Sequence, residues 1–326
     1  MTTRIAMCVA VAALLIVAVS ADLPLPSIEN RWTIGLYAGT SAFALGPATG
    51  VANPVLTADD VTDVPAAFVA DPFVIRSGMI WNLFCEVFNR RTRQGDIGWA
   101  TSTDLVHWTY RQIVLDEPFH LSFPYVFEAD GEHYLIPESS AIRQVRLYRA
   151  APFPTVWRYV ATLLDGLPLG DASIVKANGR WWLFAESGAN QRLSVYFADQ
   201  LTGPWQPHHR NPVAAGLDRS RPAGRVAEVD GRLIRFAQVD TPVYGRAVRA
   251  FAITALTPDS FEERPVTSGT IVGATGHGWN ARGMHQVEPI QVAPGRWLAL
   301  VDGYQSAWMI GIRHVSWRSL TGSASR

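Results

Sequence analysis

One short unit is repeated five times along this chain, and no other feature constrains the fold as strongly. Each copy has an apolar segment, a turn that contains Gly, and a second segment rich in Leu, Phe and Trp. Gly supplies the positive φ that a tight turn needs, so each copy predicts a β-hairpin. The first and last residues of every copy are 15 positions apart: Asp71 and Glu86, Phe123 and Glu138, Asp171 and Glu186, Ala223 and Gln238, Val287 and Asp302.

Further strands follow these hairpins. Third strands are expected around Ile97, Val145, Leu193 and Ala250, and a Trp precedes a fourth strand at Trp108, Trp157 and Trp205. Four strands in units that start 48 to 64 residues apart are typical of propeller blades. The sequence therefore predicts an all-β fold, a five-bladed β-propeller.

The ends of the chain are expected to share the fifth blade. The segment from Trp32 to Tyr37 has the pattern of a third strand with no hairpin before it, and the last unit runs out near Trp317. A ring closed by strands from both termini leaves no exposed sheet edge. We therefore expect a single propeller domain over residues 22–326.

The first 21 residues have the pattern of an export signal. Arg4 precedes an apolar run from Ile5 to Val19, and the small residues Ser20 and Ala21 come before Asp22. A retained membrane anchor through residues 5–20 is the alternative. Either reading places the folded part outside the cytoplasm, in the periplasm or the extracellular space.

Composition excludes several classes of function. Lys and Arg balance Asp and Glu at 28 each, with no basic run that could follow a phosphate backbone, so nucleic acid is not an expected partner. Of the two cysteines, Cys8 lies in the apolar run, so Cys85 has no disulfide partner in a processed chain and no cysteine zinc site is possible. The 12 Trp and nine Tyr can pack between sheets or offer flat faces to sugar rings.

Acidic residues are expected to converge at one end of the propeller. The first strand of each blade lines the central channel, so Asp71 and Asp171 should lie at one mouth of it. An even hairpin register brings the closing residues to the same end, namely Glu86, Glu138, Glu186, Gln238 and Asp302. Two carboxyl groups that face each other across a concave site are what glycoside cleavage requires. They can equally hold sugar hydroxyls without reacting, and some can serve only to bond neighbouring blades.

Basic and polar side chains accompany these acids. Arg221 and Arg225 flank Ala223, while His120 and His285 precede the second and fifth blades. Arginine can hold a carboxylate or phosphate bidentately, which would suit an acidic or phosphorylated glycan, or it can pair with a channel acid. A His among these carboxylates could hold a cation, but no residues have the spacing of metal ligands, so no metal and no cofactor are expected.

Several segments resemble a known family. They are Asn53–Ala58, Phe68–Phe73, Phe119–Phe127, Ser220–Arg225 and Gly278–His285. They look like the propeller domain at the N-terminus of plant glucosamine inositolphosphorylceramide transferases, and like its stand-alone bacterial relatives. The resemblance extends from about Trp32 to Tyr304. It implies little about activity, because glycosyl transfer in the plant proteins is assigned to a separate C-terminal domain.

A more distant resemblance concerns the five-bladed glycoside hydrolases of families 32, 43, 62 and 68. It implies that Asp71 is the general base or nucleophile, and that Asp171 orients the substrate and tunes the acid. The acid itself does not carry over, because Pro222 stands where family 43 has Glu. Glu138 or Glu228 could substitute, although neither is at the matching position, and Glu138 is preferred. The second His of the family's Gly-Met-His-His motif is Gln286 here.

These observations lead to two hypotheses. The favoured one is an exported glycoside hydrolase-like enzyme that acts on a glycan or glycolipid, with Asp71, Asp171 and Glu138 as catalytic residues. The alternative is a non-catalytic glycan-binding propeller that assists the synthesis of an envelope polysaccharide or glycolipid. In either case the expected substrate-binding residues are Glu86, Glu186, His120, Arg221, Arg225, Gln238, His285 and Asp302.

Overall fold

The structure is a computed structural model, and it describes residues 22–188 and 191–314. The expected export segment, residues 1–21, and Trp317 lie outside the described residues. The chain divides into two compact units, of which the larger is Arg31–Gln305 and the smaller comprises the two ends. No helix in the described part of the chain is long and apolar enough to cross a membrane.

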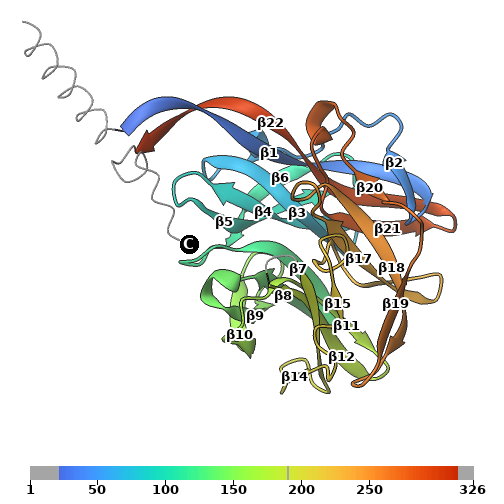
Figure 1. Ribbon diagram of the computed structural model, residues 1–326. Helices are drawn as coiled ribbons and strands as arrows, with labels where there is room; N and C mark the ends of the chain where they lie inside the picture. Colours follow the sequence, from blue (N-terminus) through green and yellow to red (C-terminus); the bar gives the residue numbers. More distant parts are fainter. Residues whose placement is uncertain (1–21, 189–190, 315–326) are drawn as a thin grey trace, which may run out of the picture. The chain divides into compact units, whose positions relative to one another are not determined.

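Arg31–Gln305 folds as the predicted five-bladed β-propeller, in which each blade is a separate antiparallel sheet (Figure 1). Blade one contains β3 (Ala66–Ser77), β4 (Ile80–Asn89), β5 (Gln94–Ser102) and β6 (Thr109–Leu115). Blade two contains β7 (Ser122–Ala129), β8 (Glu132–Glu138), β9 (Gln144–Ala150) and β10 (Trp157–Asp165). Blade three contains β11 (Gly170–Ala177), β12 (Arg180–Ser187), β13 (Arg192–Ala198), β14 (Gln206–Pro207) and β15 (Ala214–Ala215).

The last two blades are less regular. Blade four contains β16 (Ala227–Val229), β17 (Arg232–Val239), β18 (Ala247–Leu256), β19 (Phe261–Pro265) and β20 (Val272–Gly273). Blade five contains β1 (Asp22–Ser41), β2 (Ala44–Pro47), β21 (Val287–Ala293) and β22 (Arg296–His314). Three single-turn 3-10 helices lie in loops, at Ala58–Asp60, Ser140–Ile142 and Gly278–Asn280.

Strands from both ends of the chain close the ring, as the sequence predicted. In blade five the order is β2-β1-β22-β21, so the blue N-terminal strand lies beside the red C-terminal strand in Figure 1. Thr33 Oγ1 reaches the carbonyl oxygen of Gly303 across this pair at 3.5 Å. The described residues of the smaller unit are the outer ends of β1 and β22, where Ser306 Oγ lies 3.0 Å from Asn30 Oδ1.

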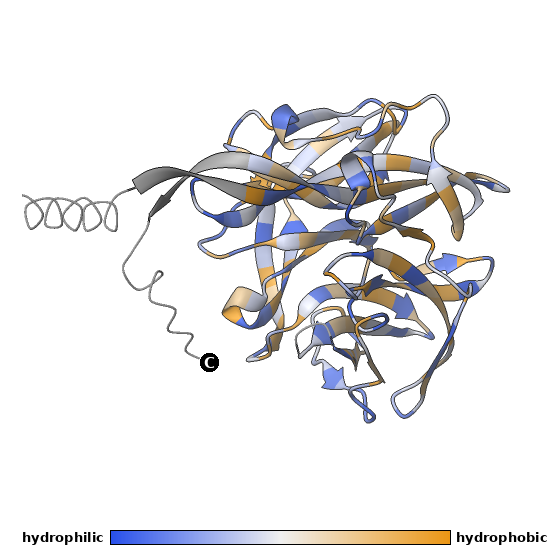
Figure 2. Cartoon of the chain, turned by 45° about the horizontal axis from the view of Figure 1, so that its top comes forward, coloured by the Kyte–Doolittle hydropathy of each residue, from blue (hydrophilic) through white to orange (hydrophobic). Residues whose placement is uncertain are grey.

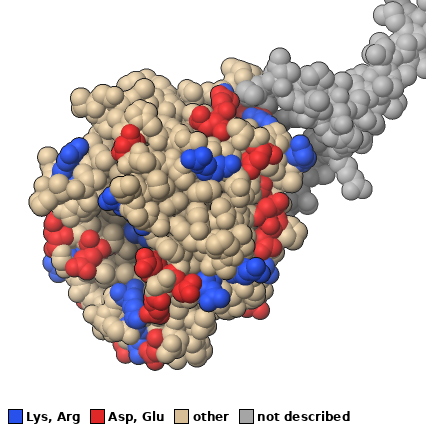
Figure 3. Space-filling view, turned by 180° about the vertical axis from the view of Figure 1, so that it is seen from behind, with Lys and Arg blue, Asp and Glu red and all other residues tan. Residues whose placement is uncertain are grey.

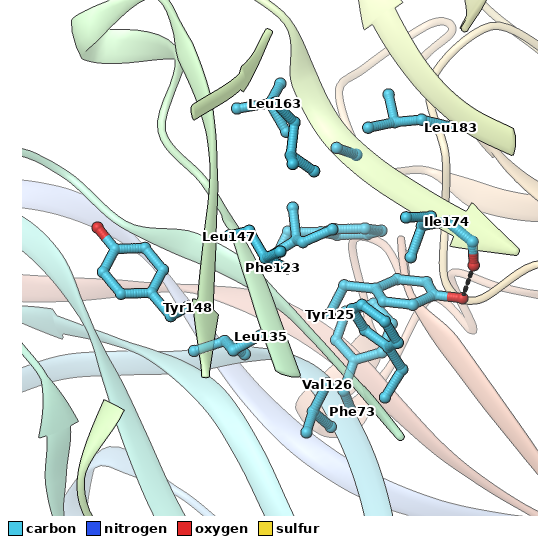
Figure 4. Close-up of a cluster of buried hydrophobic side chains, with 14 of the residues drawn as sticks. Phe73, Phe123, Tyr125, Val126, Leu135, Leu147, Tyr148, Leu163, Ile174 and Leu183 are labelled. Carbon is cyan, nitrogen blue, oxygen red and sulfur yellow. Dashed lines mark hydrogen bonds between the residues drawn. The ribbon is translucent and has the colours of Figure 1, made fainter. Parts of the chain in front are cut away.

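The core of the propeller consists of apolar side chains between neighbouring blades. Hydrophobic residues occur along the strands (Figure 2), and β4 and β12 have runs of consecutive buried residues, so both faces of these strands bury side chains. Figure 4 shows one such layer, in which Phe73 of blade one and Tyr125 of blade two meet Ile174 of blade three. The hydroxyl of Tyr125 donates to the carbonyl oxygen of Ile174, which ties these two inner strands together.

The innermost strands contact one another around the axis. The amide of Phe123 donates to Asp71 Oδ2 at 3.0 Å, and the amide of Val287 donates to the carbonyl oxygen of Ala223 at 2.9 Å. Ala223 itself precedes β16, but its amide bonds to the carbonyl oxygen of Phe236 in β17, so it continues the innermost strand of blade four. The five leading residues therefore occupy equivalent positions in their blades.

A bulge lies at the leading residue of each of the first three blades. The register shifts between Ala70 and Phe73, and again at the matching points of blades two and three. At these bulges Asp71, Phe123 and Asp171 have φ angles of 55°, 44° and 51°. For a residue with a side chain, this left-handed conformation costs about 1–2 kcal/mol. Bulges re-aim side chains and are frequent beside functional sites.

Charged side chains of both signs are mixed on the face shown in Figure 3, and no large patch of one sign is visible there.

Candidate functional site at the axial mouth

Six buried carboxyl side chains belong to the leading and closing columns, and we call them the axial acids: Asp71, Glu86, Glu138, Asp171, Glu186 and Asp302. In the first three blades, the closing Glu pairs with the residue just before the leading one, as Ala70 does with Glu86. This register brings closing and leading side chains to the same end of the channel. We call that end the axial mouth.

Burial raises the pKa values of three of these acids. The pKa of Asp71 is raised to about 7, mainly by burial; His285 opposes the shift, while Asp171 and Asp302 add to it. Burial is also the main cause of the raised pKa of Glu138. For Glu86, burial and the neighbouring carboxylate of Asp71 hold the pKa well above its usual range. At neutral pH the carboxyl group of Asp71 is therefore present in both its charged and its neutral form.

His285 links the two acids of blades five and one. Its Nδ1 lies 2.6 Å from Asp302 Oδ2, and its Nε2 lies 3.6 Å from Asp71 Oδ1. Burial lowers the pKa of His285, but the carboxylates of Asp302 and Asp71 outweigh it and raise the pKa to about 9. The ring stacks on Trp32 with a centroid distance of 4.0 Å, so its orientation is fixed from a third side.

Among the described residues, one cluster of acidic and histidine side chains could hold a metal cation. Asp71, His285 and Asp302 each offer a ligand atom, and these atoms lie within 4.8 Å of one another. His285 and Asp302 already form a close ion pair, with 2.6 Å between Nδ1 and Oδ2.

Asp171 is held by blade four. Arg221 donates from Nε to Asp171 Oδ2 at 2.5 Å and from Nη2 to Oδ1 at 3.2 Å. Gln238 Nε2 adds a hydrogen bond to Oδ2 at 2.9 Å. A bidentate arginine neutralises the carboxylate and fixes its plane. Arg221 and Gln238, both expected to bind substrate, thus lie at the axial mouth, but against Asp171.

His120 and the remaining glutamates lie around the same mouth. His120 Nδ1 accepts the amide proton of Gly95 at 2.8 Å, so the ring proton is on Nε2, which lies 3.6 Å from Glu86 Oε1. Burial lowers the pKa of His120, which favours the neutral ring. Glu138 Oε1 accepts from the amide of Ser140 at 3.2 Å. A Cβ on Gly170 would lie 3.1 Å from Glu186 Oε2, so the glycine leaves room for this carboxylate.

Arg225 is not among the contacts of the axial acids. Its Nη2 lies 2.7 Å from Glu288 Oε1 and 3.1 Å from the carbonyl oxygen of Val126. Its guanidinium also lies 5.1 Å from the centre of the Tyr125 ring. The sequence analysis allowed such an arginine to pair with a channel acid, without naming the acid. That partner is the buried Glu288, which is absent from the predicted site residues.

Tyr244 is the functional candidate that sequence reasoning missed. It lies in the loop between β17 and β18, with 44% of its surface exposed. Its ring centre is 5.5 Å from that of His285, edge to face, and 5.4 Å from the guanidinium carbon of Arg221. Asp240 Oδ1 fixes this loop by accepting from the amide of Gly245 at 2.8 Å. No repeat or motif marks the loop, so the sequence carried no signal for it.

Two surface pockets lie away from the axial mouth, on blades three and four. Their volumes are about 220 and 470 Å³, and they share Arg180, Asp199 and Pro258. Arg180 Nε is bonded to Asp199 Oδ1 at 2.8 Å, so the shared wall is an ion pair. None of the predicted site residues lines either pocket.

Comparison with solved structures concerns the fold. The catalytic domain of a glycoside hydrolase family 62 α-L-arabinofuranosidase from Coprinopsis cinerea is similar, with a TM-score of 0.58 and 13% identity over 85% of this chain and 98% of that one. A glycosyl hydrolase from Bacteroides ovatus has a TM-score of 0.55 and 13% identity over 78% of this chain and 92% of that one. At this identity the likeness shows a shared propeller fold.

Sequence comparison identifies the family. Glucosamine inositolphosphorylceramide transferase 1 from Oryza sativa subsp. japonica is 38% identical over 86% of this chain and 41% of its own length. The protein of the same name from Arabidopsis thaliana is 36% identical over 84% of this chain and 39% of its own. The chain thus spans about two fifths of these relatives. Residues 26–304 match the family described as glucosamine inositolphosphorylceramide transferase 1, N-terminal, and the chain belongs to that family.

Proposed function

We propose that the axial mouth binds a neutral, hydroxyl-rich sugar of a glycan or glycolipid, and that recognition is the function of this propeller. The observation that carries the proposal is the position of Tyr244. Its half-exposed ring lies beside the Arg221–Asp171 pair and against His285, so an aromatic face adjoins a dense set of polar groups.

This combination matches the two sides of a sugar ring. The C–H face of a pyranose is apolar and packs on an aromatic ring, while its hydroxyls need directed acceptors and donors. Carboxylates supply acceptors, and protonated carboxyl groups and His120 Nε2 supply donors. Asp71, which has both a charged and a neutral form at neutral pH, thus suits hydroxyl groups, which both donate and accept.

Charge at the mouth favours a neutral ligand. Asp171 compensates the guanidinium of Arg221 at 2.5 Å, and Asp302 compensates the ring of His285 at 2.6 Å. An anionic sugar would have to displace one of these short ion pairs and leave a buried carboxylate without its partner, which costs several kcal/mol.

The contacts of Asp171 favour recognition over cleavage. A hydrolase would use this carboxylate to orient the substrate and tune an acid, but Arg221 and Gln238 already engage both of its oxygens. Pro222 occupies the position where family 43 enzymes carry that acid. The relatives named glucosamine inositolphosphorylceramide transferase 1 are also consistent with recognition. This chain matches the family described as their N-terminal part, and it covers 41% of the length of the Oryza sativa relative.

Hydrolysis is the second candidate function, and one observation favours it. Asp71 has a pKa raised to about 7, and burial also raises the pKa of Glu138. Carboxyl groups with raised pKa values are the usual proton donors in glycoside cleavage.

The test is binding of purified protein to an array of neutral and acidic oligosaccharides. Wild type should retain neutral glycans, and Tyr244→Ala should lose them. Tyr159→Ala is the matched control, because Tyr159 is also exposed but lies on outer strand β10. Retention of the same glycans by Tyr244→Ala would refute the proposal, and selective retention of phosphorylated or carboxylated glycans would refute its neutral-ligand part.

A further inference from the structure

We infer that blade four carries a second site, separate from the axial mouth, for a singly charged oxyanion such as a phosphodiester or a carboxylate. Three arginines surround the buried ring of Phe251 in this blade. The guanidinium carbons of Arg235, Arg249 and Arg219 lie 5.1, 5.2 and 5.6 Å from its centre. We call these three residues the arginine triad.

Two acids meet the triad, one fewer than its positive charges. Glu263 Oε1 accepts from Arg235 Nη2 at 2.8 Å and from Arg219 Nη2 at 3.1 Å, so two guanidinium groups share one carboxylate. Arg249 Nη1 pairs with Asp218 Oδ2 at 2.7 Å. Within the described residues the group therefore has one uncompensated positive charge, which a single monoanion would balance.

Buried donors point to the same conclusion. Arg235 is only 1% exposed, yet its Nη1 has no acceptor among the described residues, and neither does Nε of Arg219. A buried N–H group without an acceptor is unfavourable by about 1–3 kcal/mol, so native proteins rarely leave one. Donors on two neighbouring guanidinium groups suit an oxyanion, because it offers several acceptor atoms together with charge.

The site is open on one side and closed on the other. Arg219 and Arg249 have side chains 39% and 22% exposed, whereas Arg235 and Glu263 are each 1% exposed. An anion can therefore approach the two outer arginines from solvent, while Glu263 holds Arg219 and Asp218 holds Arg249. Phe251 keeps the three cations close together through contacts with its ring.

The triad is distinct from the axial mouth but adjacent to it along the chain. Arg235 Nη2 also donates to the carbonyl oxygen of Arg219 at 2.8 Å, which fixes the loop that continues to Arg221. Arg219 and Arg221 thus face two different acids, Glu263 and Asp171, from one short segment. Substitution of the side chain of Arg219 or Arg249 leaves this bond from Arg235, and with it the proposed sugar site, in place.

Binding of simple probes tests the inference. Wild-type protein is titrated with dimethyl phosphate and, separately, with acetate, and its melting temperature is compared with that in sodium chloride of equal ionic strength. Occupancy should raise the melting temperature in proportion to the logarithm of probe concentration above Kd. The probe with the larger shift identifies the phosphodiester or the carboxylate as the natural chemistry.

Variants locate the effect. Arg219→Gln and Arg249→Gln should each weaken probe binding about tenfold, the loss expected for one charge-assisted hydrogen bond. Arg264→Gln is the matched control. This substitution removes the same charge, and Arg264 is exposed on the same strand as Glu263. Circular dichroism confirms that each variant is folded. No shift above sodium chloride with either probe would overturn the inference, as would an equal loss of binding in Arg264→Gln.

Discussion

Asp302 accepts the backbone amide of Asp71, 231 residues earlier in the chain, on its Oδ2 at 3.2 Å. The other oxygen of Asp302 accepts the amides of His285 and Gln286, at 3.0 and 2.9 Å. Asp71 in turn accepts the amide of Phe123. Through these carboxylates, blade five is bonded to blade one and blade one to blade two, so the axial acids contribute to ring closure as well as to the candidate site.

The role of Asp302 in closure predicts a large effect on stability. Asp302→Asn keeps the size of the side chain but removes the nearer of the two acidic partners of the buried His285. Breaking a buried pair costs about 3–5 kcal/mol, and the free energy of unfolding in urea should fall by that amount. Glu228→Gln, an exposed acid on β16, is the control and should change it by less than about 0.5 kcal/mol. An Asp302→Asn variant as stable as this control would show that the closure bonds contribute little.

Stability should fall as pH rises from about 6.5 to about 9. The folded-state pKa of His285, about 9, is above its ordinary value of 6.5. The stability that its proton contributes is therefore complete below pH 6.5 and lost as pH rises through 9. Asp71, with a pKa raised from 3.8 to about 7, acts in the same direction at lower pH, because the folded state holds its proton longer than the unfolded chain.

Melting temperatures across this pH range measure the effect. In His285→Gln the decline between pH 6.5 and 9 should largely disappear, whereas His107→Gln, which alters an exposed histidine, should retain it. A wild-type protein that gains stability over this interval would contradict the assignment.

Asp71→Asn separates the two candidate functions. If the protein cleaves a glycan, loss of the base should reduce kcat by about 10²–10⁴-fold while sugar binding persists. If the protein only binds, neither wild type nor variant should release reducing sugar from any glycan that the array shows to be bound. Reducing-end assays on those glycans give the readout, and a fully active Asp71→Asn enzyme would remove Asp71 from the catalytic role.

Export follows from the N-terminal segment and stays a prediction. Expressed with its own first 21 residues, the protein should be recovered outside the cytoplasm, with an N-terminus near Asp22 where the segment is cleaved. Cell fractionation and N-terminal sequencing provide the measurement. Replacement of Leu14 and Leu15 by Asp interrupts the apolar run and should retain the chain in the cytoplasm. Intact wild-type chain in the cytoplasmic fraction would end the export reading.

The sequence by itself determined the fold and the set of residues at the axis. Five hairpins of equal length can bury their apolar rows only against one another, so the repeat predicts both the propeller and the columns headed by Asp71 and Glu86. The pairing of β1 with β22 was also readable, because an open ring would leave strand edges unpaired.

Only the tertiary structure decided what those residues contact. Asp71 and Asp171 have left-handed φ angles that the repeat does not predict. The contacts between blades join residues far apart in the sequence: 50 residues for Arg221 and Asp171, 63 for Arg225 and Glu288, and 231 for Asp71 and Asp302. Tyr244 reaches the mouth from a loop that no repeat predicts, and the triad around Phe251 joins two strands and a loop. Periodicity fixes which face of a strand a side chain occupies, but partner choice between blades depends on packing, which the sequence pattern does not encode.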